Sequence, residues 1–486
     1  MKDLHIEWII IIAYMLFIFG KGVFKLRKIH DADDYLVAGR NAPWFLIFAT
    51  LGATVIGGGA SIGAVGKTYE WGMLFVFISS GTFLHFIFSG LVVAPQFRKW
   101  ELYTVAGYFG RRYNEQARFA AFILSLIFSV FIIAAQMAAF GSVLSTLFPQ
   151  FADNATLIRW AIIIGGTMVV VYSTAGGLLA VIHTDIYQFV ILLAGFLITL
   201  GFILPDLFVE WGGMTNTVPD SFFTLIGDKG WIFLITTFLA FLLGETFGPG
   251  YVTRYVIGKN IKHTKWGIAG VGFFLAFTFP LIIFFIALYA KIHFPGIEPQ
   301  QALPMTIQRL HNPFIAGLII AALLSAVMSS ADSALNSATA IFVKDLFEHH
   351  LGWKDRQDGK TLRLARYMTA GLGITSTLIA VLWPDIIGLL LFTYHIWAPA
   401  IILPIVVGSI SKEYSARLGK QIFASMLVAV TATMIYRTTK YAESFDPAVF
   451  GVIVSVVFYT TIKLLGRLFF GPAEQQVERA SENPQG

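Results

Sequence analysis

The sequence has no cysteine and few charged residues. None of its 486 residues is Cys, and Asp, Glu, Lys and Arg together make up only 13%. The absence of cysteine excludes disulfides, thiolate metal sites and cysteine nucleophiles, and it gives no support for redox chemistry. The sequence also lacks the His-Glu-x-x-His spacing of zinc hydrolases and any evident nucleophile–base pair. We therefore do not expect an enzyme.

Long hydrophobic runs are what the sequence has instead. Hydrophobic residues make up 57% of the chain, and about 20 consecutive apolar residues suffice to span a bilayer as a helix. This pattern predicts an all-α polytopic membrane protein with about thirteen transmembrane helices. The runs cover residues 5–24, 42–66, 71–96, 118–148, 158–174, 179–205, 229–249, 267–292, 312–346, 366–384, 386–410, 421–437 and 448–466.

The basic residues predict an orientation. Lys and Arg are retained on the cytoplasmic side of a membrane, and most of the 34 in this chain fall in cytoplasmic loops if the N-terminus lies outside and the C-terminus inside. Topology thus accounts for the net charge of +6, and no nucleic-acid partner is expected. The expected partners are membrane lipid and a small-molecule solute. The compact, short-looped chain favours a bacterial inner membrane as its location.

Residues 322–339 place hydroxyls and a carboxylate inside an apolar run. On a helix, Ala326, Ser329, Ser330 and Ser333 fall on one face, so hydroxyls and a carbonyl from a small residue converge. Oxygen ligands of this kind suit a hard cation such as Na⁺. The alternative is that the serines bond the carbonyl four residues earlier, as serines in membrane helices often do.

Helix-breaking residues cluster in two of the runs. Gly57-Gly58-Gly59 lies in the middle of the second run, and residues 244–250, Gly-Glu-Thr-Phe-Gly-Pro-Gly, close the seventh run five spans later. Interrupted spans at corresponding positions indicate a transporter built from inverted repeats, with its binding site at the bilayer midplane. The alternative is that these glycines only allow helices to pack closely.

Several motifs resemble the sodium:solute symporter family, which includes carriers of proline, pantothenate, sialic acid, sugars and choline. They lie at residues 34–40, 176–188, 326–333 and 344–347, and the resemblance extends over about residues 34–411. It implies the LeuT-type fold of two inverted five-helix repeats and a monomeric functional unit. The implied divisions are 1–40 (a peripheral first span and cytoplasmic loop), 41–205 (first repeat), 206–228 (extracellular loop), 229–411 (second repeat), 412–470 (two peripheral C-terminal spans) and 471–486 (a disordered cytoplasmic tail).

The resemblance also implies positions for sodium, the coupling ion. The first site would use the carbonyls of Ala53, Ile56 and Ala326 and the hydroxyls of Ser329 and Ser330. Some family members hold a second ion, for which the matching residues are Asp185, Ser329, Asp332 and Ser333. A carboxylate inside a membrane is costly unless it is paired or binds an ion. The two aspartates could instead brace helices through hydroxyls and amides, without an ion.

Other polar residues within the runs are candidates for contacting the solute. These are Thr54, Gly57, Ser61, His85, Gln136, Glu245, Tyr394 and His395. For the two histidines, a hydrogen bond to a neighbouring helix competes with a role as a proton relay. We expect no Lys or Arg deep in the core, so a carboxylate solute would rely on the amides of a broken helix or on the ions.

Two departures from the family pattern concern the solute. Proline carriers have an acidic residue where this chain has Val55, and choline carriers have a Trp near the Val55-Ile56 pair. The resemblance therefore does not identify the solute.

The function expected from these observations is sodium-coupled secondary active symport. A small organic solute, such as an amino acid or a carboxylate, would be imported by alternating access. A proton-coupled carrier that relays protons through Asp185, Asp332, Glu245 or His85 is one alternative. A solute sensor built on a transporter fold is another.

Overall fold

The computed structural model describes residues 4–25, 40–146, 155–210, 218–353, 359–411 and 413–470. Within these ranges the chain is helical, apart from one isolated backbone bridge between Ala42 and Gly258. Ten helices are long and apolar enough to cross a membrane, and two further pairs of helices form broken spans. The expected polytopic all-α architecture is confirmed. The predicted tail at 471–486 and most of the motif at 34–40 lie outside the described residues.

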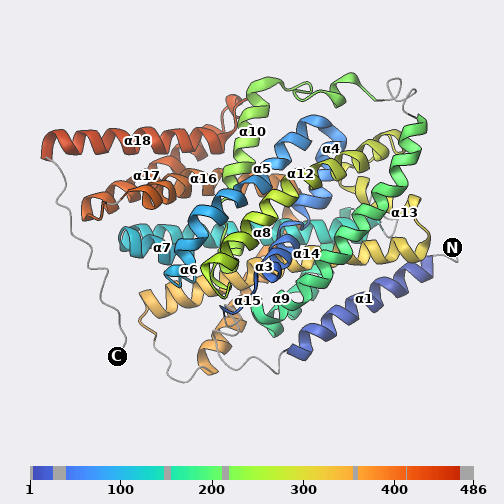
Figure 1. The fold of residues 1–486 in the computed structure, drawn as a ribbon, viewed down its shortest axis with the longest axis horizontal. Coiled ribbons are helices and arrows are strands. Elements are labelled where there is room, and N and C mark those ends of the chain that lie inside the picture. Colours follow the sequence, from blue (N-terminus) through green and yellow to red (C-terminus); the bar gives the residue numbers. More distant parts are fainter. Residues whose placement is uncertain are drawn as a thin grey trace.

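The helices follow one another with short connections (Figure 1). The first part of the chain forms α1 (Leu4–Lys25), α3 (Trp44–Val55), η3 (Gly59–Gly63), α4 (Ala64–Trp71), α5 (Met73–Phe88), η4 (Ser89–Val93), α6 (Ala94–Lys99), α7 (Val105–Arg112), α8 (Glu115–Thr146), α9 (Ala155–Glu210) and η7 (Asp220–Phe223). The second part forms α10 (Gly230–Gly244), α11 (Pro249–Val256), α12 (Ile261–His293), η8 (Pro299–Gln301), α13 (Ala302–Leu310), α14 (Pro313–Ile341), η9 (Phe342–His350), α15 (Gly359–Leu382), α16 (Ile386–Ile410), α17 (Ala416–Arg437), η10 (Lys440–Glu443) and α18 (Pro447–Phe470).

Two spans are broken where the glycine clusters lie. Helix α3 meets the helical segment Gly59–Trp71 at 62°, and α10 meets α11 at 48°. A Cβ atom on Gly58 would collide with the Cβ of Ala139, so the first break packs directly against α8. In the second break Phe247 has a positive φ of 62°, and Pro249 opens α11 at a position where its missing N–H costs nothing.

Helix α14 lies at the centre of the molecule. All residues from Ile319 to Ile341 are buried, and the helix contacts α1, α3, α8, α9, α11 and α15. The many Ala and Ser residues of this stretch let the surrounding backbones approach closely. The serine face identified in the sequence is therefore turned toward other helices and not toward lipid.

Helix α9 holds two predicted spans in one helical element. The runs at 158–174 and 179–205 correspond to apolar stretches at Thr156–Thr174 and Thr184–Val209. The hydroxyls of Tyr172 and Thr184 lie 3.2 Å apart, whereas residues twelve apart in a straight helix are separated by about 18 Å along its axis. The helical element is therefore sharply bent between these residues, which brings Tyr172 and Thr184 together.

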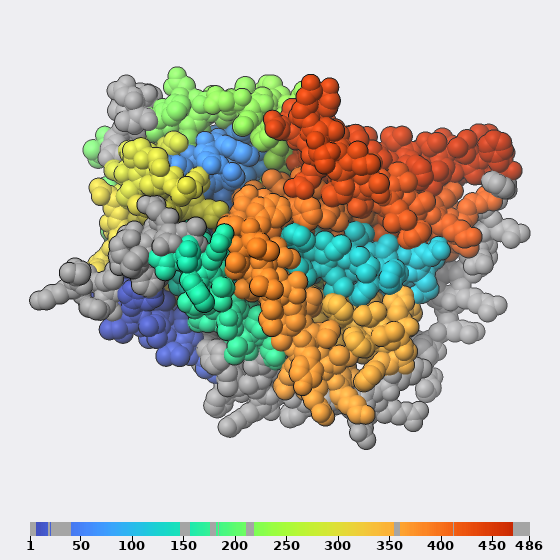
Figure 2. Space-filling model, turned by 180° about the vertical axis from the view of Figure 1, so that it is seen from behind, coloured from blue at the N-terminus to red at the C-terminus, as the bar shows by residue number. Residues whose placement is uncertain are grey.

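The first and last helices lie at opposite edges. Helix α1 packs on α9 and α14, whereas α17 and α18 pack on each other and on α16. Figure 1 shows α1 in blue at one lower edge and α18 in red at the opposite upper edge. Figure 2 shows the same separation from behind. These three helices flank the core on opposite sides, and α18 also packs on α10.

Gly72, in the turn between α4 and α5, supplies a stability test. Its φ of 59° and ψ of −137° are accessible to glycine, and a Cβ atom there would collide with the carbonyl of Phe222. We expect Gly72→Ala to cost about 1–3 kcal/mol and to lower the melting temperature in detergent. Gly371→Ala in α15 is the control, because no atom lies within 4 Å of the added carbon. Equal melting temperatures for both variants would contradict the strain at Gly72.

Candidate functional site

The end of α3 releases backbone carbonyls at the centre of the molecule. The last four carbonyls of a helix lack partners within that helix, and in α3 these belong to Gly52, Ala53, Thr54 and Val55. The amide of Ile56 bonds the first of them at 3.0 Å. The Ala53 carbonyl, a predicted sodium ligand, belongs to the same set.

Ser330 joins the end of α3 to α14. Its hydroxyl lies 2.7 Å from the carbonyl of Thr54 and 3.1 Å from the carbonyl of Ala326. The predicted convergence of Ala326 and Ser330 on the first break is thus present. The alternative, in which a serine bonds the carbonyl four residues earlier, is also present, because Ser330 bonds the carbonyl of Ala326.

Gln136 of α8 supports the glycine break. Its Oε1 accepts a hydrogen bond of 2.7 Å from the amide of Gly58. A Cβ atom on Gly57 would collide with the hydroxyl of Ser330 and come within 2.6 Å of Gln136 Oε1. The glycines are therefore required for close packing at this break, and they also expose amides that a straight helix would use internally.

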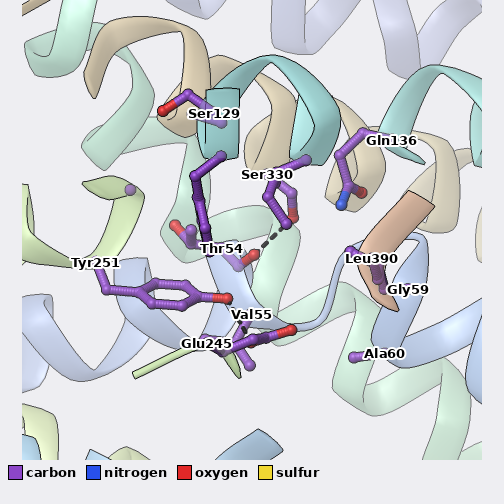
Figure 3. A pocket seen from close by; sticks show the side chains of 14 residues that line it. Thr54, Val55, Gly59, Ala60, Ser129, Gln136, Glu245, Tyr251, Ser330 and Leu390 are labelled. Carbon is purple, nitrogen blue, oxygen red and sulfur yellow. Dashed lines mark hydrogen bonds between the residues drawn. The ribbon is translucent and has the colours of Figure 1, made fainter. Parts of the chain in front are cut away.

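A cavity opens beside this break (Figure 3). In this conformation it is narrow, with a volume of about 40 Å³, which leaves room for a few water molecules. Three sequence candidates line it together with Ser330, namely Thr54, Gln136 and Glu245. The other lining residues are Val55, Gly59, Ala60, Phe128, Ser129, Ile132, Gly250, Tyr251, Ala334 and Leu390.

Glu245 is the acidic group of the cavity. It lies at the α10 break with 7% of its surface exposed. It accepts hydrogen bonds from the hydroxyls of Tyr251, at 2.7 Å, and of Tyr394. Tyr394 therefore bonds Glu245 but does not itself line the cavity. Tyr251 was not among the sequence candidates, although its place just after the Gly-Pro-Gly break is a signal that could have identified it.

Asp185 is the centre of a second polar cluster. This residue of α9 is fully buried and accepts hydrogen bonds from the hydroxyls of Thr50 and Ser329. Ser329 thus lies between the two predicted sodium sites and bonds the carboxylate of the second. Ser333 also belongs to this cluster, with its hydroxyl 3.2 Å from that of Thr54.

Arg254 corrects the expectation that no basic residue lies deep in the core. This residue of α11 is fully buried. Its guanidinium nitrogen Nη2 lies 3.6 Å from Asp185 Oδ2 and 2.5 Å from the hydroxyl of Ser333. The prediction failed because the apolar run ended at residue 249, whereas the chain continues inward as α11 after the break.

Asp332, the remaining candidate for the second sodium site, bonds a different neighbour. Its carboxylate accepts a hydrogen bond from Ser173 of α9 and is buried. In this conformation no hydrogen bond joins Asp332 to Asp185 or Ser333 among the described residues. The structure therefore brings together Asp185, Ser329 and Ser333, and it gives Asp332 a bracing contact.

The other candidates lie away from the cavity. The hydroxyl of Ser61 bonds the carbonyl of Gly57 at 2.6 Å. His85 is buried with its ring 3.9 Å from that of Phe86, and neither of its nitrogens has a hydrogen-bond partner among the described residues. The same holds for His395. The expected hydrogen bond to a neighbouring helix is therefore wrong for His85, whereas His395 keeps a 3.5 Å contact between its Nε2 and Asp446 Oδ1, beside α18.

Known proteins resemble this chain along most of its length. The model of the Sodium:solute symporter family matches residues 35–417. A sodium/sialic acid symporter from Aliivibrio fischeri is 29% identical over 390 residues, covering 76% of this chain and 75% of the relative. The high-affinity proline transporter PutP of Bacillus subtilis is 24% identical over 465 residues, covering 91% and 94%. A solved Na⁺-coupled sialic acid symporter in a substrate-bound outward-open state shares the fold, with a TM-score of 0.79 and 22% identity over 97% of this chain and 99% of that one.

Two broken spans around a buried, oxygen-lined centre are features of a membrane transporter. The chain belongs to the sodium:solute symporter family. It is a sodium-coupled symporter in a multi-pass membrane setting and not an enzyme. The proton-coupled and sensor alternatives are not favoured.

Gln136 allows a test of the first break. Gln136→Leu removes the acceptor of the buried Gly58 amide, and an unpaired buried amide costs about 1–3 kcal/mol. We expect a lower melting temperature and weaker sodium-dependent uptake in proteoliposomes. Ser145→Ala on the same helix is the control, because within the described ranges its hydroxyl bonds a carbonyl of its own helix, that of Ser142. If Gln136→Leu behaved like this control, Gln136 would not support the break.

Proposed function

We propose that the coupling sodium ion binds between the end of α3 and the middle of α14. The ligands are the carbonyls of Ala53, Ile56 and Ala326 and the hydroxyls of Ser329 and Ser330. The observation that supports this proposal most is the position of the Ser330 hydroxyl between the carbonyls of Thr54 and Ala326. A cation placed there would take carbonyls that the broken helix leaves without amide partners.

Coupling follows from this location. Because the ion joins α3 to α14, its binding favours conformations in which the solute cavity beside the same break is formed. By linkage, sodium must raise solute affinity by the factor by which solute raises sodium affinity. Entry of the ion down its gradient releases about 2.3 kcal/mol per charge per 100 mV of membrane potential, in addition to the concentration term.

The solute cavity supports a particular chemistry. Glu245 with its two tyrosine donors is the acidic group of the cavity, so we infer that an amine or hydroxyl of the solute faces it. The solutes named for relatives are sialic acid, choline, glucose and proline. An amino acid or a hydroxylated carboxylate agrees best with this cavity.

The second ion position competes with Arg254. If sodium binds among Asp185, Ser329, Asp332 and Ser333, the guanidinium now beside Asp185 and Ser333 must first move away. Asp332 would also have to leave Ser173. We propose that this exchange of one cation for another accompanies a change of state during transport.

The larger architecture completes the proposal. We infer a monomeric unit with thirteen spans, in which α1 and the hairpin of α17 and α18 flank two inverted repeats at 41–205 and 229–411. The two breaks lie in the first span of each repeat, which supports these boundaries. The N-terminus lies outside and the C-terminus in the cytoplasm, and the surrounding lipid is the bacterial inner membrane. A four-helix bundle and the scaffold around it rock about the midplane site.

Paired serine substitutions test the first sodium site. We expect Ser329→Ala combined with Ser330→Ala to abolish sodium-dependent uptake and the stabilisation of the purified protein by Na⁺ over K⁺, since a ligand of the folded state raises its stability. Ser325→Ala is the control, because this buried serine lies one turn earlier and its hydroxyl faces Met15 and Tyr14 of α1, away from the α3 break. Sodium dependence that survives the double substitution would remove these residues from the site.

Charge-balanced substitutions test the second position. Asp185→Asn alone leaves the Arg254 charge buried and unpaired, which is destabilising in itself. The double variant Asp185→Asn, Arg254→Gln removes both charges, so a change in its sodium binding cannot be attributed to a buried, unpaired charge. We expect its sodium Hill slope to fall to about 1, the value for a single ion. If the double variant keeps the Hill slope of the unaltered protein, Asp185 does not bind an ion and serves only to pair with Arg254.

A further inference from the structure

A second cavity lies beyond the first, beside the C-terminal hairpin. It is bounded by α10, α16 and the segment from Arg437 to Pro447, which links α17 to α18. Its volume is about 490 Å³. This cavity is large enough for a small organic molecule, and the sodium sites and solute contacts proposed above do not use it.

His395 gives this cavity an unsatisfied polar wall. The side chain lines the cavity with 7% of its surface exposed. Its Nε2 lies 3.5 Å from Asp446 Oδ1, and neither ring nitrogen has a hydrogen-bond partner among the described residues. The same oxygen of Asp446 accepts a bond of 2.8 Å from the amide of Ala448 at the start of α18. Buried polar atoms in native proteins have partners, so His395 would gain one if its ring turned to bring a nitrogen to a ligand in the cavity.

Cations outnumber free acids at the mouth. Arg437 and Lys440 are exposed and line the cavity together with Glu443. Neither cation forms an ion pair within the described part of the chain. The Arg437 guanidinium rests 4.8 Å from the centre of the Phe392 ring, which positions it. Two cations and one acid at the rim, with Asp446 engaged in the wall, favour a ligand that presents a carboxylate and a second hydrogen-bonding group.

This outer cavity is adjacent to the solute cavity, and side chains shared by neighbouring cavities separate the two. Phe75 and Phe241 line both the outer cavity and an intermediate one. The intermediate cavity in turn shares Gly59, Ala60, Glu245 and Leu390 with the cavity beside the α3 break. The two phenylalanine rings meet edge to face, with centroids 5.6 Å apart. A solute moving inward from the outer cavity would pass this aromatic pair.

We propose that the outer cavity is a second binding station for the transported solute, one that recognises its carboxylate through Arg437 and Lys440 and its neighbouring hydroxyl or amine through His395 and Glu443. This inference rests on the proposed function, because it assumes that the solute enters from the side of the α17–α18 link. It assigns a role in solute capture to the peripheral C-terminal hairpin, which lies outside the two repeats.

The natural absence of cysteine allows a direct test of the cavity. A single Thr237→Cys places a thiol in its wall, and Thr224→Cys places one at an exposed position in the loop before α10. Each is reacted with a sulfonate-bearing and a trimethylammonium-bearing methanethiosulfonate. Relative to Thr224→Cys, we expect the anionic reagent to be favoured by about threefold or more at Thr237→Cys, and Arg437→Gln with Lys440→Gln to abolish that preference.

Protection from the anionic reagent then tests solute binding. Sialic acid and proline, which carry a carboxylate, should protect Thr237→Cys, whereas glucose and choline should not. Adding Gly57→Val disables the inner site through collision with Ser330, and protection should persist in that variant. If it folds poorly, His395→Ala in the otherwise unaltered Thr237→Cys protein should weaken protection instead.

Three results would overturn the proposal: an unreactive Thr237→Cys, a charge preference equal to that of Thr224→Cys, or protection by all four solutes alike. The reagent preference requires no transport, so it separates failure of this station from failure of the sodium-coupled function. Loss of uptake in the serine variants with an intact reagent preference would concern the sodium site alone.

Discussion

Backbone carbonyls released inside a membrane protein are the constraint on which this structure depends. Where α3 ends at Val55, carbonyls lose their helical partners among buried residues at the centre of the molecule, where each needs another partner. The hydroxyl of Ser330 takes one, and Gln136 takes the amide of Gly58 on the other side of the break. The break is thus tolerated only because α8 and α14 supply polar groups at matching heights, and the same groups make it a site that a cation can use.

The pair of Asp185 and Arg254 shows the same need for partners, here for two full charges. Both side chains are completely buried, and each also has hydroxyl partners, Thr50 and Ser329 for the acid and Ser333 for the base. Burial of two charges costs several kcal/mol per ion unless they are paired and hydrogen-bonded. The exchange of Arg254 for sodium that we propose would take place among these serine and threonine hydroxyls.

Much of this arrangement could be predicted from the sequence. The glycine clusters at 57–59 and 244–250 coincide with the two bends, and the serine face of residues 326–333 is buried at the centre. These predictions succeeded because they rest on local composition and helical periodicity. Arg254 was missed because an apolar run that stops at a break resembles the end of a span, and the unpaired state of His85 depends on neighbours that periodicity does not identify.

The sequence by itself determined that the chain is a helical membrane protein, where its spans are interrupted and which family it resembles. The length of apolar runs, the positions of helix breakers and the motifs are properties of consecutive residues, so the sequence alone reveals them. Only the tertiary structure decided that Ser329 bonds Asp185, that Asp332 turns to Ser173 and that Arg254 completes the cluster. Those contacts join residues up to 159 positions apart in the chain, and such partners are selected by helix packing rather than by local pattern.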